Sequence, residues 1–329
     1  MEFFRILIKL NFYKLFNIFI AYSSYGISSV FKKVIVWGKP FTLSIEPINS
    51  CNLQCLECPT GNDSLLRQKQ SFDVNLYQKI IDENKTSLIY LLLYFQGEPF
   101  MNKNIFEIIS YASKSGIYTM TSTNGHFITV ENAKKIVDSK LDKIIISLDG
   151  TTQETYEQYR KNGSFETVIS GIEALVAEKK MQKSKRPFIE LQFLVLKTNE
   201  HQISAIKQLG KRLEVDSVRL KTAQIYDYKN GNPLIPTIDK YSRYRKNNDG
   251  TYSFKRNPAN TCWRLWSSAV VSVNGSVVPC CYDKDTRHVM GSLENSSMTQ
   301  IWKNANYQAF RKQIITSKKD VMICEECIV

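Results

Sequence analysis

The sequence lacks an apolar run long enough to cross a membrane. Met1–Tyr22 is rich in Phe, Ile and Leu, but charged and polar residues interrupt it, and a spanning helix needs about 20 consecutive apolar residues. No small-residue cleavage site follows, so the segment does not predict a signal peptide. The eight cysteines show no secretory disulfide framework. They favour metal binding in a reducing compartment, which predicts a cytoplasmic location.

A nucleic-acid-binding module is also missing. The net charge of +13 comes from 44 basic and 31 acidic residues, and the lysines are spread along the chain. We therefore expect no nucleic-acid partner. Histidine, the usual general base, occurs only at His126, His201 and His288. Their positions in turns and at helix starts do not identify a catalytic base.

Three cysteines stand close together after an apolar strand pattern at residues 42–48. Cys51, Cys55 and Cys58 have the spacing CxxxCxxC. Thiolates are the ligands of iron–sulfur clusters, and one short loop can place three of them around a corner of a four-iron cubane. No fourth cysteine lies nearby in the sequence, so one iron would stay open. A zinc knuckle and buried core cysteines are the alternatives.

The segment Cys51-Asn-Leu-Gln-Cys55-Leu-Glu-Cys58 resembles the signature of the radical S-adenosylmethionine (radical SAM) enzymes. The resemblance implies that the open iron chelates the amino and carboxylate groups of SAM. It also implies that one electron from the cluster cleaves SAM to methionine and a 5′-deoxyadenosyl radical.

Further motifs of that family follow in the same order, each at the end of a predicted strand. Gly97-Glu98-Pro99 resembles the GGEP motif, with Gln96 in place of its first glycine. Polar side chains at the carboxyl ends of parallel strands gather where such folds bind ligands. The resemblance implies that Arg160 pairs with the carboxylate of SAM. The predicted SAM-binding residues are Gly97, Glu98, Ser122, Asn124, Ser147, Asp149 and Arg160.

Strand-like and helix-like segments alternate through the first two thirds of the chain, which predicts an α/β fold. The resemblance implies a partial (β/α)6 TIM-like barrel, followed by a small α+β auxiliary-cluster domain. The predicted strands are 42–48, 88–96, 117–122, 143–148, 188–196 and 216–221. The predicted helices are 73–85, 102–115, 129–139, 165–181 and 200–213.

The other five cysteines lie in the last 70 residues. Asn274-Gly275 between two apolar runs predicts a hairpin, which delivers Cys280 and Cys281. This region resembles the SPASM and twitch domains, and the resemblance implies one auxiliary [4Fe–4S] cluster held by Cys262, Cys280, Cys324 and Cys327. Cys281 in place of Cys280, and a structural zinc site, remain alternatives.

We predict four segments from these patterns. Residues 1–40 form an apolar, basic helical segment that either lies at an anionic membrane surface or covers the barrel. Residues 41–225 form the radical SAM core. Residues 226–258 form a linker with little core of its own, and residues 259–329 form the auxiliary domain.

The predicted function is that of a radical SAM oxidoreductase that abstracts hydrogen from its substrate, with the auxiliary cluster transferring an electron. The favoured substrate is a sugar, cyclitol or glycolipid alcohol, because no leader-peptide recognition domain precedes the barrel. A SPASM-type peptide or protein maturase and a non-catalytic iron–sulfur or zinc protein are the alternatives. A flavodoxin or ferredoxin-type reductant is the expected partner. A membrane-surface location would make the protein peripheral at the inner face.

Overall fold

The computed structural model describes residues 2–255, 261–325 and 327, and it divides them into two compact units. Unit 1 holds residues 2–50, 66–120 and those from 261 onward, and unit 2 holds residues 51–65 and 121–255. The predicted domain boundaries remain predictions. The predicted boundary between linker and auxiliary domain, at 258/259, lies outside the described residues.

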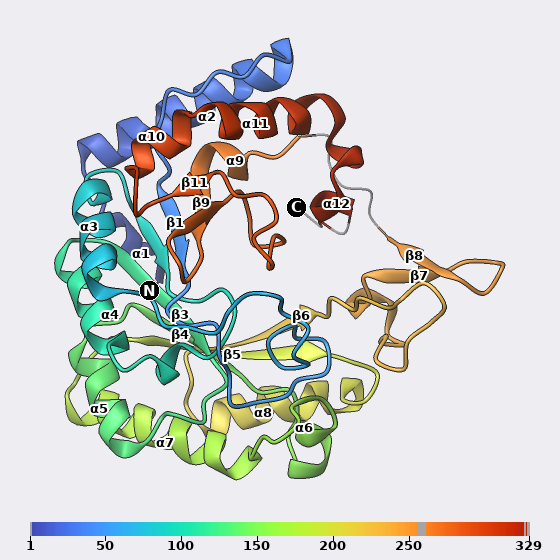
Figure 1. The fold of residues 1–329 in the computed structure, drawn as a ribbon. Helices are drawn as coiled ribbons and strands as arrows, with labels where there is room; N and C mark the ends of the chain where they lie inside the picture. The colour runs from blue at the N-terminus through green and yellow to red at the C-terminus, as the bar shows by residue number, and fades with distance from the viewer. Residues whose placement is uncertain (1, 256–260, 326, 328–329) are drawn as a thin grey trace. The chain divides into compact units, whose positions relative to one another are not determined.

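Unit 1 is built on strand β1, which has parallel neighbours on both sides (Figure 1). β1 (Thr42–Ile45) pairs with β2 (Tyr90–Leu92) and with β9 (Ser268–Val271), so a strand from the C-terminal region joins the first strand of the predicted core. β9 continues through the predicted hairpin into β10 (Ser276–Val278), which pairs with β11 (Gly291–Ser292). β2 pairs in parallel with the first half of β3 (Tyr118–Thr123).

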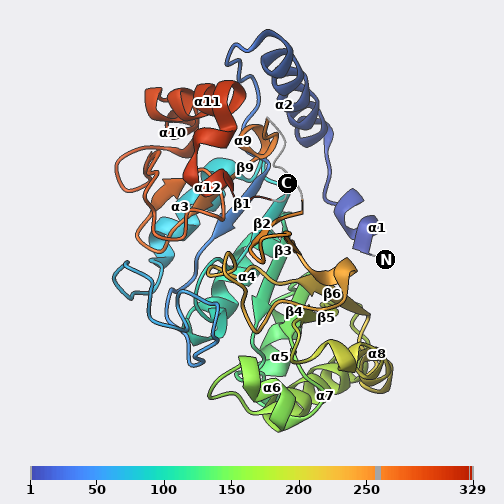
Figure 2. The ribbon, with the colours of Figure 1, turned by 90° about the vertical axis from the view of Figure 1, so that its right-hand side faces the viewer.

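The helices of unit 1 come from both ends of the chain. Figure 2 shows the N-terminal helix α2 beside α9, and their residues are in contact. α10 begins at a capping box formed by Ser297 and Gln300, which satisfies backbone donors that would otherwise lack partners. The helices are α1 (Glu2–Leu7), α2 (Phe12–Phe31), α3 (Val74–Asn84), α4 (Ile105–Lys114), α9 (Arg264–Ser267), α10 (Met298–Lys303), α11 (Ala305–Ser317) and α12 (Met322–Glu325), with 3₁₀ turns η1 (Pro99–Met101) and η4 (Lys318–Asp320).

Unit 2 repeats the β/α pattern with three parallel strands. β4 (Lys143–Ser147) is buried along its whole length, as expected of a strand covered on both faces, and pairs with β5 (Phe188–Val195), which pairs with β6 (Ser217–Thr222). Figures 1 and 2 show the helices of this unit on one side of these strands. They are α5 (Val130–Asp138), α6 (Gln153–Tyr159), α7 (Phe165–Met181) and α8 (Ile203–Arg212), with 3₁₀ turns η2 (Glu200–Gln202) and η3 (Asp239–Tyr241).

The α/β class and the mostly parallel strand pairing are thus confirmed. The segment predicted as a linker differs from expectation, because it has a core. Tyr228 stacks on Tyr244 with ring centroids 4.7 Å apart, and Phe254 meets both rings. β7 (Tyr244–Lys246) and β8 (Tyr252–Phe254) form a hairpin around them. Its aromatic residues follow no helix or strand period, so the sequence pattern hid their burial.

A buried carboxylate organises unit 1. Glu46 follows β1, its side chain is fully buried, and its two oxygens accept from Arg67 Nη1 at 2.5 Å and Nη2 at 2.7 Å. The backbone N–H groups of Gln96 and Val273 also donate to it, at 3.2 and 2.9 Å. Arg67 Nε donates to the carbonyl of Lys284 at 2.7 Å. One ion pair therefore ties together four segments that are far apart in the sequence.

Arg67→Met tests how much of the stability of unit 1 depends on this pair. The change leaves a buried carboxylate without its cation, and we expect a loss of about 3–5 kcal/mol in the free energy of unfolding, measured by urea denaturation. Lys85→Met is the matched control, because Lys85 and Asp82 form an exposed pair whose loss should leave the midpoint unchanged. Equal midpoints for both variants would contradict the role of the pair.

Candidate iron–sulfur and SAM sites

The loop with the first three cysteines lies in unit 2, inside a hydrophobic cluster. Cys55 is buried among Leu53, Tyr159 and the aromatic residues of the segment predicted as a linker, and Cys51 and Cys58 pack partly buried against the same cluster. The backbone N–H groups of Gln54 and Leu56 donate to the carbonyls of Lys161 and Tyr159. The loop is therefore held against the end of α6 in a setting that keeps much of the solvent away.

Two of these three sulfurs accept hydrogen bonds from the protein. The N–H of Leu53 and the amide of Asn124 lie 3.4 and 3.7 Å from Cys51 Sγ, and Arg160 Nη1 lies 3.7 Å from Cys55 Sγ. Burial raises the pKa of the Cys55 thiol, and the charge of Arg160 opposes that rise. Donors aimed at sulfur stabilise a thiolate and tune a bound cluster. The donor set therefore fits an iron–sulfur cluster.

Arg160 is fixed by a second predicted residue. Its Nε donates to Asp149 Oδ2 at 2.6 Å, and Asp149 Oδ1 accepts from the N–H of Leu194 at 2.6 Å. Asp149 is fully buried at its carboxylate, and the nearby negative charge helps keep the pKa of Arg160 well above its usual value despite burial. Because Arg160 Nε donates to Asp149, the terminal nitrogens of Arg160 are the ones that can bind other groups.

The predicted residues at the ends of β3 and β4 have distinct surroundings. The Asn124 amide donates to Asn52 Oδ1 at 2.8 Å, so it reaches the cysteine loop through two of its residues. His126, which we expected to be a turn residue, accepts from the N–H of Ser164 at 2.8 Å through Nε2. Burial lowers its pKa. Ser122 and Ser147 lie at the carboxyl ends of their strands, where the sequence pattern put them.

The turn with Gly97 and Glu98 belongs to unit 1. Gly97 has a φ of +75°, and a Cβ there would lie 2.5 Å from the carbonyl oxygen of Ile48 and 2.7 Å from that of Ser50. Gln96 keeps a negative φ, so the replaced glycine of the GGEP motif is not needed for the backbone. Glu98 is buried, and its carboxylate accepts a hydrogen bond from the N–H of Phe100. Its own N–H donates to the carbonyl of Ser50, the residue before Cys51.

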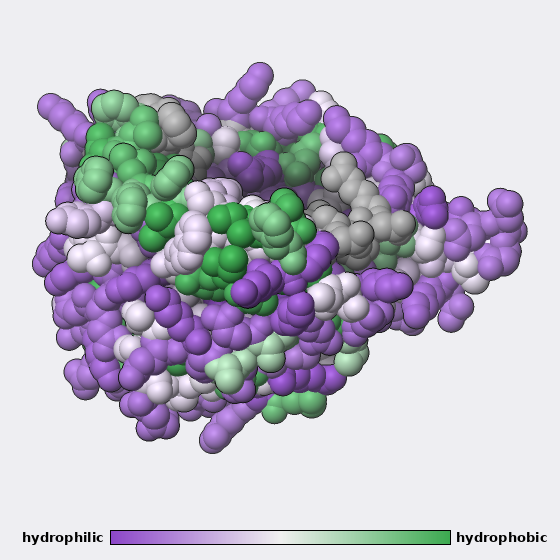
Figure 3. Space-filling model, turned by 90° about the horizontal axis from the view of Figure 1, so that it is seen from above, coloured by the Kyte–Doolittle hydropathy of each residue, from purple (hydrophilic) through white to green (hydrophobic). Residues whose placement is uncertain are grey.

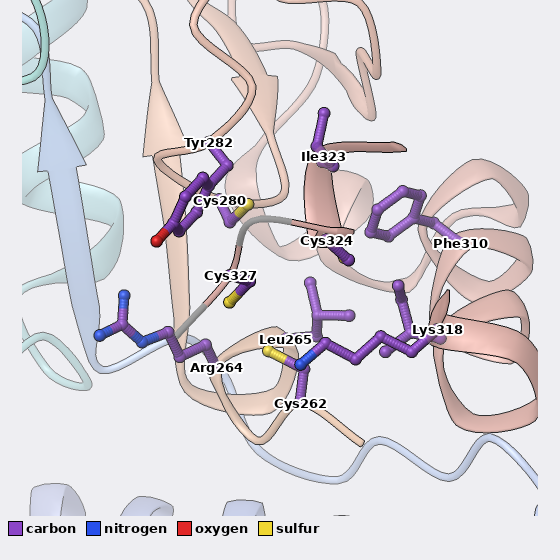
Figure 4. Close-up of a pocket in the computed structure, with 11 residues that line it drawn as sticks. Cys262, Arg264, Leu265, Cys280, Tyr282, Phe310, Lys318, Ile323, Cys324 and Cys327 are labelled. Carbon is purple, nitrogen blue, oxygen red and sulfur yellow. The ribbon is translucent and has the colours of Figure 1, made fainter. Parts of the chain in front are cut away.

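The four predicted auxiliary ligands line one pocket of unit 1 (Figure 4). Cys262, Cys280, Cys324 and Cys327 surround it together with apolar side chains, whereas Cys281 is exposed and does not line it. Burial raises the pKa of Cys262, Cys280 and Cys324, to about 11 for Cys324. Four cysteines around one pocket match the ligand number of a [4Fe–4S] cluster and also that of a structural zinc site.

Sequence reasoning missed several residues at these sites. Lys318 lines the auxiliary pocket with its amine near Cys262 (Figure 4), and its charge lowers the pKa of Cys262 and Cys324 against the effect of burial. No spacing rule connects Lys318 to the cysteines. Glu46 and Asn52 were detectable in part, because Glu46 follows the first strand and Asn52 lies within the cysteine motif.

Comparison with known proteins places these sites in a family. The radical SAM superfamily matches residues 45–184, and the iron–sulfur cluster-binding domain called SPASM matches residues 262–328. An AdoMet-dependent heme synthase of Methanosarcina barkeri is 28% identical over 55% of this chain and 50% of its own length. The mycofactocin maturase MftC of Mycolicibacterium smegmatis is 30% identical over 41% of this chain and 34% of its own length. The chain thus spans a half or less of these relatives.

Solved structures share the fold over most of the chain. SuiB of Streptococcus suis bound to S-adenosylmethionine is 13% identical and has a TM-score of 0.63 over 89% of this chain and 73% of its own. The same protein bound to its precursor peptide SuiA has a TM-score of 0.60 over 84% of this chain and 67% of its own. The partial barrel and the auxiliary domain are thus confirmed as the fold class. The chain thus carries a domain of the radical SAM superfamily at residues 45–184 and a SPASM-type iron–sulfur domain at residues 262–328.

Proposed function

We propose that the protein is a radical SAM oxidoreductase whose cofactors are SAM and two [4Fe–4S] clusters. The observation that carries this proposal is the set of donors around the cysteine loop. Asn124 and Arg160, from other segments, direct N–H groups at the sulfurs of Cys51 and Cys55. A cluster held there by Cys51, Cys55 and Cys58 would supply the electron for reductive cleavage of SAM, and the resulting chemistry would be hydrogen abstraction from the substrate.

The protein side chains have defined tasks in this proposal. Cys51, Cys55 and Cys58 hold the first cluster, and the surrounding aromatic cluster limits access of water. Arg160, held through Nε by Asp149, offers its terminal nitrogens to the carboxylate of SAM. Gly97 and Glu98 form a turn next to Ser50, and we assign them to the amino group of SAM. Ser122, Asn124 and Ser147 complete the polar rim at the strand ends.

The auxiliary cluster has four thiolate ligands in this proposal. Cys262, Cys280, Cys324 and Cys327 line a common pocket, and Cys281 stays outside it. Because four cysteines would leave no vacant iron for substrate, a cluster held there would serve electron transfer. A flavodoxin or ferredoxin-type protein is the proposed reductant.

Two substrate classes compete. A sugar, cyclitol or glycolipid alcohol remains our first choice, together with a cytoplasmic location at the inner membrane face, because the N-terminal helices expose large apolar side chains. Peptide maturation is the second candidate. The likeness to SuiB, which has been solved with a precursor peptide, supports it.

Iron counting and SAM cleavage test the cofactor proposal. After anaerobic reconstitution with iron and sulfide, the chain should bind about eight irons and release 5′-deoxyadenosine under reduction. Cys51→Ala should abolish 5′-deoxyadenosine release. Cys280→Ala should lower the count to about four, whereas the adjacent Cys281→Ala should keep about eight, because Cys281 lies outside the pocket. Loss of iron in Cys281→Ala, or zinc in place of iron, would contradict the assignment.

Gly97→Ala tests the turn assigned to SAM. The added Cβ would collide with two backbone oxygens and displace the turn, and misplacement by about 1 Å can cost 100-fold. We expect the rate of 5′-deoxyadenosine release under reduction to fall by about that factor. Gly116→Ala is the matched control: its φ of +72° imposes the same left-handed strain, but a Cβ there meets nothing within 4 Å. Equal release rates in both variants would remove Gly97 from the site.

A further inference from the structure

Helix α2 has its polarity inverted relative to a helix that faces water. The side chains turned toward the protein are small or polar: Lys14 is 3% exposed, and Ser24 and Ser28 are 0% exposed. The side chains turned outward are large and apolar, with Phe12 75% exposed and Phe19 66% exposed. A helix of a globular protein normally buries its apolar stripe, so the outer face of α2 calls for a different apolar partner.

Hydrogen bonds fix this orientation. Lys14 Nζ donates to the carbonyl of Gly116 at 2.9 Å, and Asn17 exchanges two hydrogen bonds with the backbone of Lys39 at 2.8 and 3.0 Å. The Ser28 hydroxyl accepts from the N–H of Ile35 at 2.9 Å and lies 3.0 Å from its carbonyl oxygen. Rotating α2 to bury its aromatic face would leave these buried groups without partners, which is costly. The apolar face is therefore held outward.

Many of the large exposed apolar residues lie in the N-terminal segment. Figure 3, which views the molecule from above Figure 1, shows hydrophobic patches on this face. Single exposed apolar residues are ordinary, but a concentration of them in one segment marks an interaction site. This set, which we call the outer face, comprises Phe4, Leu7, Ile8, Phe12, Tyr13, Leu15, Phe16 and Phe19.

Charge identifies the partner. Between Glu2 and Glu46 the chain has no acidic residue and six basic ones, Arg5, Lys9, Lys14, Lys32, Lys33 and Lys39. Lys32 and Lys33 follow the end of α2 and are exposed. A second copy of this chain would bring two positively charged segments together, which disfavours a symmetric dimer through this face. Anionic lipid headgroups, in contrast, attract the exposed Lys32 and Lys33 while their acyl chains accept the aromatic side chains.

No helix in the part of the chain that the structure describes is long and apolar enough to cross a membrane. We propose that the outer face of α1 and α2 lies in the headgroup region of an anionic membrane and docks the protein there without spanning it. This inference rests on the membrane location given under the proposed function. It adds that the partner at this location is the anionic lipid surface. It involves no catalytic step, so vesicle binding is measured without SAM or substrate and can fail independently of catalysis.

The test is flotation of the full chain with vesicles. Wild type should bind vesicles of phosphatidylcholine and phosphatidylglycerol, and binding to phosphatidylcholine alone should be much weaker. Replacing Phe12→Ser, Phe16→Ser and Phe19→Ser together should reduce binding at least about tenfold, because binding follows buried apolar area. The matched control replaces Leu66→Ser, Val130→Ser and Met181→Ser, which are equally exposed elsewhere and should leave binding unchanged.

Three outcomes would overturn the proposal. Wild type could fail to float with either vesicle, or the triple Phe variant and the control could bind equally. Sedimentation equilibrium tests whether a second copy of the chain binds the outer face instead. A wild-type dimer that dissociates in the triple Phe variant, together with no vesicle binding, would identify the second copy as the partner. Lys32→Gln with Lys33→Gln should weaken binding to the anionic vesicles selectively and reduce its dependence on salt.

Discussion

Unit 1 depends on the burial of one carboxylate. A charge removed from water must be matched by hydrogen bonds and by an opposite charge, and Glu46 obtains both from Arg67 and from the backbone of Gln96 and Val273. The segments that supply these donors therefore meet at one side chain. As a result, the turn assigned to SAM and the hairpin that leads to Cys280 are both hydrogen-bonded to the carboxylate of Glu46, through Gln96 and Val273.

This arrangement explains why the departure from the GGEP motif is tolerated. The residue before Gly97 contributes its backbone N–H to Glu46 and needs no left-handed backbone, so a glutamine serves at that position. Gly97 itself has a positive φ and lies against two carbonyl oxygens, and only a residue without a side chain fits there. The backbone therefore requires a glycine at position 97 of the motif but not at position 96.

Local patterns predicted the local structure well. The hairpin at Asn274-Gly275, the predicted helices and five of the six strands lie close to the predicted ranges, since each follows from apolar periodicity or turn chemistry, whereas the predicted strand 88–96 is formed only at Tyr90–Leu92. The pairing of β9 with β1, the ion pair of Glu46 and Arg67, and the core around Tyr228 and Tyr244 join distant segments. Such contacts leave no periodic signal, so one sequence could not reveal them.

The two cysteine sites share one electrostatic principle, although they lie in different units. Burial raises the pKa of Cys55 in the first site and of Cys262 and Cys324 in the second, and a cation opposes each rise: Arg160 acts on Cys55, and Lys318 acts on Cys262 and Cys324. Metal binding requires thiolates and so must displace these protons. A nearby fixed cation lowers the cost of that step before any metal arrives. The family motifs gave the positions of the proposed ligands, but only the folded chain shows which charges lie beside them.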